Sequence, residues 1–290
     1  MKILAFGEIL FDVDTAKNES VLGGAPMNFC SHLAKLGADG YMLSAVGDDE
    51  SGREALGYAD KFGVKRDYVF ISSEPTGKCF IKYNNGEPSY DLSMVSAYDH
   101  IGITDEIINK IKSEKFDVFY MGTLAQRNHT SFSSLNKLLS EADFPIVFYD
   151  MNLRQNYHTR EIIEKSLGAC NILKINREEY DFLIKQGYAA DKEELAEKYD
   201  IDIVLLTLDK DGAEVYGKKI KESIFAEGIK TEVVSTVGAG DSMCACFLYN
   251  LLNGKDAETA IRRANILASY VVSHKEAIPE YTKELLEKIR

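Results

Sequence analysis

The chain has 290 residues, of which 45% are hydrophobic, and this is enough for the buried core of one large α/β domain or of two small ones. Disorder over the whole chain is therefore excluded. The 34 Lys and Arg residues stand against 46 Asp and Glu residues, a formal net charge of −12, and no dense basic run occurs. This balance argues against nucleic acid as a partner.

The cysteines and the N-terminal segment indicate a cytoplasmic protein. The five cysteines form no C-x-x-C pair, and we therefore expect them to be reduced, buried thiols. The N-terminal segment reaches Glu8 and Asp12 too soon for a secretory signal, and the apolar run at residues 243–249 is far shorter than a membrane span. We therefore expect no membrane partner. The cysteines are Cys30, Cys79, Cys170, Cys244 and Cys246.

Short runs rich in β-branched and aromatic residues recur along the chain, and a stretch with helical spacing follows most of them. This alternation predicts an α/β fold with a doubly wound, mainly parallel sheet between helices. Pro26 begins one predicted helix and Gly37 ends it, and a second predicted helix ends at Gly63. The predicted strands cover residues 2–6, 41–46, 116–121, 145–150, 171–175 and 202–208.

One segment departs from this alternation. Residues 77–95 contain two strand-like runs around Asn85-Gly86, the strongest short signal for a β-hairpin. No internal repeat, low-complexity tract or flexible linker divides the chain. We therefore expect a single domain over residues 1–290 that carries a small β appendage.

The sequence "STVGAGDSMC" at residues 235–244 places Gly238, Ala239 and Gly240 before Asp241 and an apolar helix. Small residues expose backbone N–H groups, and a helix N-terminus leaves such donors free to bind an anion. In the functional interpretation, these donors stabilise a transferring phosphoryl group while Asp241 accepts a hydroxyl proton. A helix N-terminus favours the ionised carboxylate, so we expect Asp241 to be a weak base suited to late proton uptake. In the structural interpretation, the stretch is an ordinary capped helix start.

Two other phosphate-binding devices are excluded by the sequence. "GAEVYGKK" at residues 212–219 has the glycine spacing and lysine of a P-loop, but it ends in Lys219 where a P-loop has Ser or Thr, and its interior alternates like a strand. We read it as part of a hairpin. A dinucleotide fingerprint is absent because Met243 occupies its third glycine position.

A second glycine turn lies near the N-terminus, where Gly23 and Gly24 precede a helix that carries Asn28 in its first turn. Such glycines allow a ligand to approach the backbone, although a tight strand-to-helix turn also explains them. Asp12 follows the first strand, where its carboxylate is able to accept hydrogen bonds from two hydroxyls of a polyol. The alternative for Asp12 is a solvated loop residue.

Polar residues also follow two later strands. Asp150, Asn152 and Arg154 lie just beyond one strand, and Asn176 and Glu179 lie at the next strand-to-helix junction. Asn176 and Glu179 match a capping box, which needs no function. In the functional interpretation, Glu179 helps to hold the water shell of Mg²⁺. The five histidines have no metal-ligand spacing.

Taken in order, these motifs resemble the ribokinase-like carbohydrate kinases, the pfkB family, over essentially the whole chain. Within that family the chain is most similar to the bacterial fructokinases, through Gly23-Gly24-Ala25-Pro26, "GTLAQRN" at residues 122–128 and "NLRQ" at residues 152–155. The five motifs that carry the family resemblance lie at residues 23–56, 150–158, 174–183, 205–216 and 235–248.

The resemblance implies a doubly wound α/β domain with a small β-sheet lid, formed by about residues 10–22 and 77–95. It also implies roles for particular positions. The catalytic base would be Asp241, and Gly238, Ala239 and Gly240 would form its anion hole. The sugar-binding positions would be Asp12, Gly23, Gly24, Asn28 and Arg154. The nucleotide would contact Asn176, Thr207, Gly212 and Asn265, and Glu179 would serve magnesium.

One position departs from the family pattern. The family usually has Asp-Thr where this chain has Ser235-Thr236, and that Asp commonly helps to bind an activating monovalent cation. The resemblance therefore leaves dependence on K⁺ open.

The sequence thus predicts a kinase that uses ATP and Mg²⁺ to phosphorylate a primary hydroxyl of a sugar, with D-fructose as the first choice. The alternative substrates are 2-keto-3-deoxygluconate, whose carboxylate would pair with Arg154, and ribose or a nucleoside. A different class of function is a sugar or nucleotide sensor without turnover. The resemblance also allows a homodimer formed through the lid.

Overall fold

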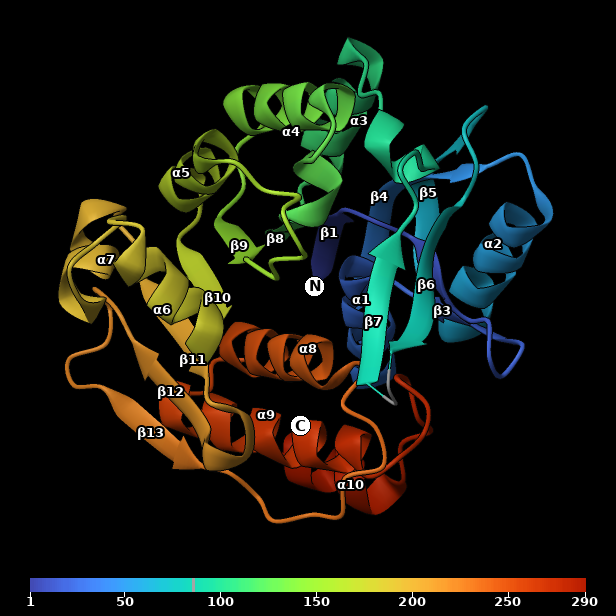
Figure 1. Cartoon of the computed structure of the whole chain (residues 1–290). Helices are drawn as coiled ribbons and strands as arrows, with labels where there is room; N and C mark the ends of the chain where they lie inside the picture. The colour runs from blue at the N-terminus through green and yellow to red at the C-terminus, as the bar shows by residue number, and fades with distance from the viewer. Residues whose placement is uncertain (85–86) are drawn as a thin grey trace.

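The computed structural model describes residues 1–84 and 87–290, whose strands form two sheets (Figure 1). The larger sheet has the order β13-β12-β11-β10-β9-β8-β1-β4-β5. Strands from β11 to β5 pair in parallel, and β12 and β13 add an antiparallel edge. The six predicted strands are confirmed. This sheet contains β1 (Lys2–Phe6), β4 (Asp39–Gly47), β5 (Lys65–Ser72), β8 (Val118–Gly122), β9 (Ile146–Asp150), β10 (Ile172–Asn176), β11 (Ile203–Thr207), β12 (Gly212–Tyr216) and β13 (Ile224–Glu227).

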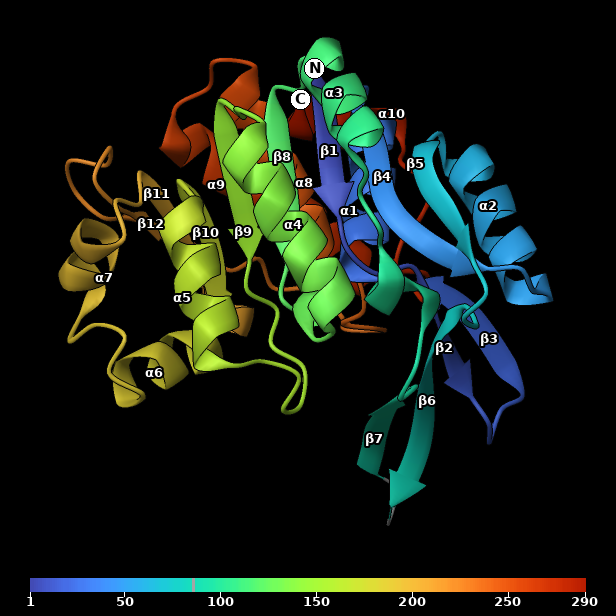
Figure 2. The ribbon, with the colours of Figure 1, turned by 90° about the horizontal axis from the view of Figure 1, so that it is seen from above.

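Helices cover both faces of the larger sheet, which confirms the doubly wound α/β prediction (Figures 1 and 2). One face packs against α3, α4, α5, α6 and α7, and the other against α1, α2, α8, α9 and α10. The helices are α1 (Ala25–Leu36), α2 (Glu50–Phe62), α3 (Asp105–Glu114), α4 (His129–Glu141), α5 (Arg160–Ala169), α6 (Arg177–Lys185), α7 (Lys192–Lys198), α8 (Ala239–Leu252), α9 (Ala257–Val272) and α10 (Lys283–Ile289).

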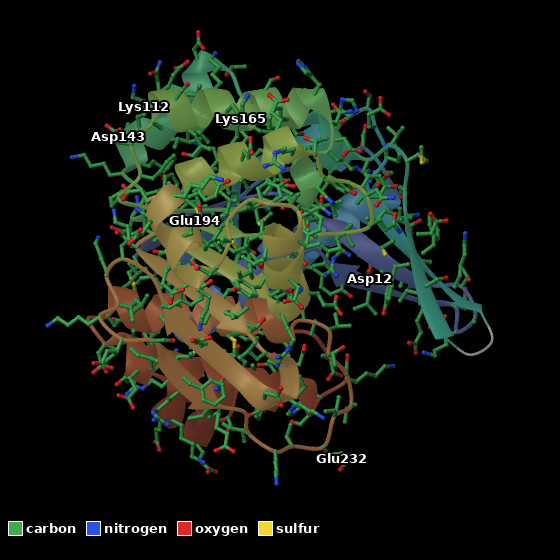
Figure 3. The ribbon with its side chains drawn as sticks, turned by 60° about the vertical axis from the view of Figure 1, so that its left-hand side comes forward. Asp12, Lys112, Asp143, Lys165, Glu194 and Glu232 are labelled. Atoms are coloured by element: carbon green, nitrogen blue, oxygen red, sulfur yellow. The ribbon has the colours of Figure 1, made fainter. Side chains whose placement is uncertain are left out.

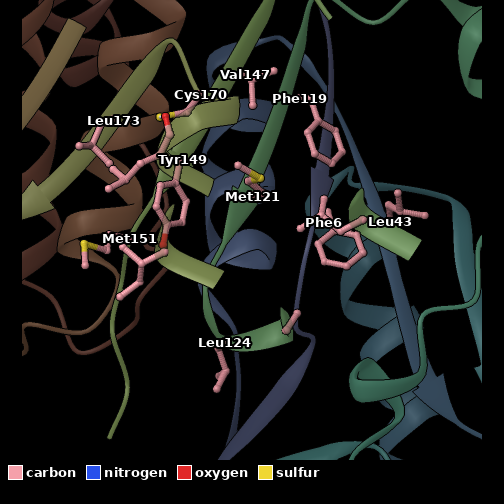
Figure 4. Close-up of a cluster of buried hydrophobic side chains, with 14 of the residues drawn as sticks. Phe6, Leu43, Phe119, Met121, Leu124, Val147, Tyr149, Met151, Cys170 and Leu173 are labelled. Atoms are coloured by element: carbon pink, nitrogen blue, oxygen red, sulfur yellow. The ribbon is translucent and has the colours of Figure 1, made fainter. Parts of the chain in front are cut away.

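The central strands are buried on both sides, so their side chains alternate between two cores. In β1, Leu4 and Phe6 join the cluster beneath α3 and α4, whereas Ile3 and Ala5 join the cluster beneath α1 and α8. Figure 4 shows part of the first cluster, where Phe6, Phe119 and Tyr149 lie on neighbouring strands of the sheet. A strand buried on both faces fixes the position of the loop at its carboxyl end, where functional groups gather in parallel sheets.

The smaller sheet has the strand order β3-β2-β6-β7 and projects beyond the carboxyl end of β1 (Figure 2). Strands β2 and β6 pair in parallel, and β6 and β7 form the antiparallel hairpin predicted for residues 77–95. The Asn85-Gly86 turn lies outside the described residues. The expected appendage segment at residues 10–22 extends by one residue, because Gly23 pairs with Leu10. The strands are β2 (Leu10–Asp14), β3 (Glu19–Gly23), β6 (Gly77–Asn84) and β7 (Glu87–Leu92).

The predicted helix ends and the excluded P-loop agree with the structure. Pro26 lies in the first turn of α1, and Gly37 and Gly63 end α1 and α2 in the left-handed conformation that glycine adopts without strain. The stretch at residues 212–219 begins as strand β12, which forms a hairpin with β11. All five cysteines are buried free thiols. Within residues 1–84 and 87–290, no helix is long and apolar enough to span a membrane.

A buried arginine anchors the end of the smaller sheet. Arg127 donates to both carboxylate oxygens of Asp99 at 2.7 Å and to the carbonyl oxygen of Ser93, just beyond β7. The side chains of Arg127 and Asp99 are only 6% and 3% exposed. The guanidinium also lies over the rings of Tyr98 and Tyr157. Because each charge is compensated only while its partner is present, this pair holds the exit of the smaller sheet on the larger domain.

We expect Arg127→Met to lower the free energy of unfolding by about 3 to 5 kcal/mol, because it leaves the carboxylate of Asp99 buried without a counter-charge. Urea denaturation followed by circular dichroism measures this loss. The matched control is Arg66→Met, which breaks the solvent-exposed ion pair with Asp60 and is expected to cost less than about 1 kcal/mol. Equal losses in the two variants would contradict an anchoring role for Arg127.

Candidate active site

The predicted anion-binding turn is a helix N-terminus with an obligatory glycine. Gly238 precedes α8 with a φ of 80°, and a Cβ there would lie 2.7 Å from the carbonyl oxygen of Ala277. Ala239 and Gly240 form the first turn of α8, whose N–H groups have no acceptor inside the helix. The N–H of Ala239 already donates to the carbonyl oxygen of Thr236 at 3.4 Å, whereas the N–H of Gly240, which has no side chain, stays accessible to an anion.

Asp241 follows in the same turn and contacts a residue far away in the chain. The side chain of Asn28, in the first turns of α1, donates a hydrogen bond of 2.8 Å from Nδ2 to Asp241 Oδ2. The other polar atom of that amide, Asn28 Oδ1, is buried and has no hydrogen-bond partner in the described structure. A candidate base and an unpaired acceptor therefore lie side by side.

The sequence-based expectation of a low pKa for Asp241 is wrong. The pKa of Asp241 is raised from its ordinary value of 3.8 to about 6, chiefly by burial and in addition by the negative charge of Asp150. The hydrogen bond from Asn28 and the charges of Lys174 and Arg154 act in the opposite direction. Removal of water around the carboxylate therefore outweighs the favourable N-terminus of α8. The result is a stronger base than we expected from the sequence.

The glycine turn before α1 packs closely against the backbone of Glu8 and the carboxylate of Asp12. A Cβ at Gly24, where φ is 102°, would lie 2.5 Å from the carbonyl oxygen of Glu8. A Cβ at Gly23 would lie 2.7 Å from Oδ2 of Asp12. Close contacts within the chain therefore require glycine at both positions, whether or not a ligand also approaches there.

Glu8 is a site residue that the sequence analysis missed. It follows β1, is 3% exposed, and accepts a hydrogen bond from the backbone N–H of Ala25 at 3.3 Å. Burial raises the pKa of Glu8 to about 7, although the positive charge of Arg154 opposes this change. The Glu8 Oε2 atom has no hydrogen-bond partner in the described structure. A glutamate directly after a buried central strand was the available signal.

Asp12 and Arg154 complete the group predicted to bind a sugar. Asp12 lies on β2, directly opposite Cys79 of β6, and Figure 3 shows it where the smaller sheet meets the rest of the chain. Burial raises the pKa of Asp12, whereas a hydrogen bond from the Cys79 thiol and the charge of Arg154 lower it. Arg154 is exposed in the segment after β9, and its charge acts on Glu8, Asp12 and Asp241. Arg154 therefore links Glu8, Asp12 and Asp241 electrostatically.

Asn176 and Glu179 form the capping box that the structural interpretation predicted. Asn176 Oδ1 accepts from the N–H of Glu179, and Glu179 Oε2 accepts from the N–H of Asn176, both at 2.8 Å. Glu179 Oε1 accepts from the N–H of Leu153 at 2.8 Å. Burial raises the pKa of Glu179, and the charge of Lys174 opposes this change.

The donor set around Glu179 fits an indirect contact with magnesium. Each carboxylate oxygen uses one lone pair on a backbone N–H and keeps another for a water molecule. Mg²⁺ usually keeps several waters and takes few protein carboxylates. In the described part of the chain, no cluster of three or more His, Cys, Asp or Glu side chains is arranged to hold a metal directly.

The remaining predicted nucleotide residues lie along the antiparallel edge of the larger sheet. Thr207 ends β11, and Gly212 begins β12 with a φ of 115°, where a Cβ would lie 2.1 Å from the carbonyl oxygen of Ala226. Asn265 of α9 is buried and donates from Nδ2 to the carbonyl oxygens of Ala226 and Glu227. These contacts give Asn265 a structural role in holding β13, and its nucleotide contact stays a prediction.

A buried ion pair lies next to the turn at Gly240. The sequence analysis named Asp150 but did not predict that it pairs with Lys174. Lys174 Nζ is 3.0 Å from Asp150 Oδ1, and a Cβ at Gly240 would be 3.6 Å from the same Nζ. Burial disfavours the ammonium ion, but Asp150 and Glu179, together with Cys244, outweigh burial and raise the pKa of Lys174 above its usual value. The signal for Lys174 was a single lysine inside the apolar run at residues 171–175.

Together these groups provide the parts that transfer of an anionic group to a hydroxyl requires: a base, N–H donors at a helix N-terminus, and acceptors for a polyhydroxylated acceptor molecule. They come from β1, β2, α1, the segment after β9, and α8, which are far apart in the sequence but adjacent at the carboxyl end of β1.

Comparison with known proteins agrees with this geometry. An uncharacterised sugar kinase from Archaeoglobus fulgidus is 28% identical over 82% of this chain and 92% of its own length. A probable fructokinase-5 from Arabidopsis thaliana is 27% identical, with 96% of this chain and 93% of that protein covered. A 5-dehydro-2-deoxygluconokinase from Halalkalibacterium halodurans is 27% identical, with coverage of 95% and 88%.

Solved structures share the fold. An uncharacterised sugar kinase from Pyrococcus horikoshii, in complex with ATP, superposes with a TM-score of 0.81 at 22% identity and covers 95% of this chain and 94% of its own. A putative ribokinase II from E. coli, in complex with ATP and Mg²⁺, gives 0.79 at 19% identity, with coverage of 96% and 94%. The model of the pfkB family of carbohydrate kinases matches residues 4–284, nearly the full length. Since this match spans almost the whole chain, including both glycine turns and the ribokinase-like fold, the chain belongs to the pfkB family of carbohydrate kinases.

Proposed function

We propose that this protein is an ATP- and Mg²⁺-dependent kinase that phosphorylates a primary hydroxyl of a sugar, with D-fructose as the preferred substrate. The observation that carries the proposal is the hydrogen bond between Asn28 and Asp241, because it joins a polyol-binding residue to a base at a helix N-terminus. The family match supports the kinase reaction. The relatives include probable fructokinases, which support the choice of sugar.

In this proposal, the hydroxyl groups of the sugar donate hydrogen bonds to acceptor atoms of Asn28 and Asp12. Asn28 Oδ1 is buried and unpartnered in the described structure, so a sugar hydroxyl gives it the hydrogen bond that it lacks. Asp12 offers a carboxylate to two neighbouring hydroxyls, and Gly23 and Gly24 let the sugar approach the backbone. This orientation places one primary hydroxyl at Asp241.

Phosphoryl transfer then needs one proton acceptor and one anion hole. The sugar oxygen forms a bond to the γ-phosphorus of ATP, the bond from that phosphorus to the bridging oxygen of ADP breaks, and the hydroxyl proton passes to the Asp241 carboxylate. The N–H groups at Gly238, Ala239 and Gly240 stabilise the negative charge that develops on the phosphoryl oxygens. A pKa of about 6 leaves Asp241 mostly ionised at neutral pH, so it is ready to accept the proton.

The nucleotide extends from this turn toward the antiparallel edge of the sheet. Thr207 and Gly212 line its path, Asn265 lies at the adenine end, and Asn176 stands near the phosphates. Mg²⁺ supplies charge neutralisation on the phosphate oxygens, and Glu179 would accept hydrogen bonds from its waters. Ser235 offers a hydroxyl where the family usually has a carboxylate, so the assay described below is run with K⁺ and with choline as the counter-ion.

The smaller sheet would close over the sugar and exclude water that otherwise competes for the phosphoryl group. The smaller sheet contributes Asp12, which lies on β2, to the site. Val21 and Tyr90 of this sheet are 51% and 54% exposed, which is consistent with pairing of two copies through the lid. A homodimer therefore belongs to the proposal.

A sugar acid is the second candidate substrate, and Arg154 is the observation that favours it. Arg154 is exposed beside Asp12 and forms no ion pair with any residue in the described ranges. Its guanidinium is therefore free to pair with a substrate carboxylate. Several relatives are 5-dehydro-2-deoxygluconokinases, whose substrate name denotes an acid. 2-Keto-3-deoxygluconate belongs to this class of sugar acids, and the other rivals are ribose and nucleosides.

The first prediction concerns turnover. ADP release with ATP and Mg²⁺ is measured for fructose, ribose, 2-keto-3-deoxygluconate, 5-dehydro-2-deoxygluconate and adenosine. We expect continuous release with fructose, and we expect Asp241→Asn to lower kcat by about 10²- to 10⁴-fold because the base is lost. The control is Asp143→Asn, an exposed carboxylate that Figure 3 places across the molecule from Asp12, and it is expected to retain wild-type activity.

Each outcome of that assay has a distinct meaning. Faster turnover of another sugar overturns fructose and keeps the kinase. Saturable binding of ATP and a sugar without turnover of any panel member overturns the kinase and supports the sensor. Wild-type turnover by a folded Asp241→Asn variant contradicts the role given to Asp241.

Arg154→Gln separates a neutral sugar from a sugar acid. If fructose is the substrate, we expect KM for fructose to change by less than about threefold, because no charge pair is lost. If a sugar acid is the substrate, its KM is expected to rise by at least about tenfold, since a charge-assisted pair with the carboxylate disappears. Arg262→Gln on α9, which breaks only an exposed ion pair with Glu258, is the matched control and leaves both KM values unchanged.

A further inference from the structure

A fully enclosed ion pair lies beneath the turn that carries Asp241. Asp150 ends β9 and stands opposite Lys174 of β10 in the parallel register. Their charged atoms are 3.0 Å apart, and the two side chains are only 1% and 8% exposed. Burial of two charges carries a large desolvation cost, and a stable pair of apolar residues would fill the same space. The pair therefore calls for an explanation other than stability.

The position of Asp150 is fixed from three sides. Its Oδ1 faces Lys174, and its Oδ2 accepts a hydrogen bond of 2.9 Å from the hydroxyl of Tyr120 on β8. The thiol of Cys244, on α8, lies 3.9 Å from the same Oδ2. Tyr120 in turn stacks on Phe29, next to Asn28, with ring centroids 4.0 Å apart. The carboxylate is thus held between β8, β10 and α8, and its Oδ1 faces Lys174 as an ion pair without a hydrogen bond.

Lys174 extends from the same layer toward the catalytic turn. Its Nζ lies 3.6 Å from the place where a Cβ of Gly240 would be, so its positive charge is beneath the start of α8. No hydrogen bond or ion pair joins Asp241 to Lys174 or to Asp150 among the described residues. The pair therefore acts on Asp241 through space.

The two charges act on Asp241 in opposite directions. Asp150 raises the pKa of Asp241, and Lys174 lowers it. The other groups that face Asp241 are Asn28 of α1, which is neutral and lowers this pKa, and the Arg154 charge from the segment after β9. The other titratable groups around this cluster are Glu8 after β1, Tyr120 of β8 and Cys244 of α8, which interact electrostatically with Asp241, and Glu179 of α6, which interacts with Lys174 and Asp150.

We propose that Asp150 and Lys174 are positioning residues of the kinase reaction, a balanced pair that sets the pH at which Asp241 becomes available as the base. This inference rests on the proposed function, since it assigns the pair to the same reaction. Asp150 makes Asp241 a stronger base, and Lys174 keeps that carboxylate ionised near neutral pH.

The sign of the expected effect follows from electrostatics. A carboxylate base works only when it is ionised, so kcat/KM falls on the acid side as Asp241 takes up a proton. Loss of the Lys174 charge disfavours ionised Asp241, so the acid limb of the profile, where kcat/KM falls with falling pH, moves to higher pH. Loss of the Asp150 charge favours ionised Asp241 and moves the limb to lower pH.

The test is the pH dependence of kcat/KM from pH 5 to pH 9, measured with the best sugar of the panel. We expect Lys174→Met to shift the acid limb upward and Asp150→Asn to shift it downward, each by about 0.5 to 1 pH unit, because the charges lie close but are not in contact. The double variant is expected to return to within about 0.3 pH unit of wild type, since both charges are then absent.

Two variants distinguish an electrostatic role of the pair from a purely structural one. Lys174→Arg keeps the charge while it disturbs the packing, so it is expected to leave the limb in place even where kcat falls. Asp150→Asn keeps the shape of the side chain. Circular dichroism and thermal unfolding verify that each variant is folded, and Lys174→Arg with Asp150→Asn decide the question if Lys174→Met does not fold.

Shifts of equal sign, or no shift in either folded charge variant, would overturn the inference while wild-type turnover keeps the proposed kinase. Absence of turnover in the wild type with every sugar contradicts the kinase itself, and the inference with it.

Discussion

Asp241 must be a partly buried carboxylate that is still ionised at neutral pH, and the surrounding structure meets both conditions. Removal of water raises the pKa of Asp241, and the hydrogen bond from Asn28, together with the Lys174 and Arg154 charges, limits that rise. Water stabilises an exposed carboxylate without help from the protein. When that water is removed, the protein groups that replace it have to be held in place by the fold. The doubly wound sheet brings them from separate parts of the chain to the carboxyl end of β1.

Two glycines show how closely the backbone is drawn together around this carboxylate. Gly238 lets the start of α8 approach the carbonyl of Ala277, and Gly24 lets the start of α1 approach the carbonyl of Glu8. Both adopt positive φ angles that other residues reach only with strain. The two helix starts therefore meet with Asn28 on one and Asp241 on the other, and the contact between them is a property of the packed domain.

Local signals in the sequence were sufficient for much of the fold. The strand runs, Pro26, Gly37 and Gly63 each report on their own neighbourhood, and the capping box of Asn176 and Glu179 is readable from its spacing alone. The pKa of Asp241 was predicted wrongly, since the sequence shows the helix start but not the desolvation around it. The Lys174–Asp150 pair depends on the register of two strands separated by a helix, and Glu8 on burial beneath a turn, so neither follows from local pattern.

The most direct test of this account is a ¹³C NMR titration of aspartate carboxyl carbons in the protein without nucleotide, with Asp241 assigned from the spectrum of Asp241→Asn. The account predicts a midpoint for Asp241 near the pKa of about 6 that burial produces, clearly above its ordinary value of 3.8. A midpoint at or below the ordinary value would show that the helix N-terminus dominates desolvation, and would contradict the description of Asp241 as a base poised near neutral pH.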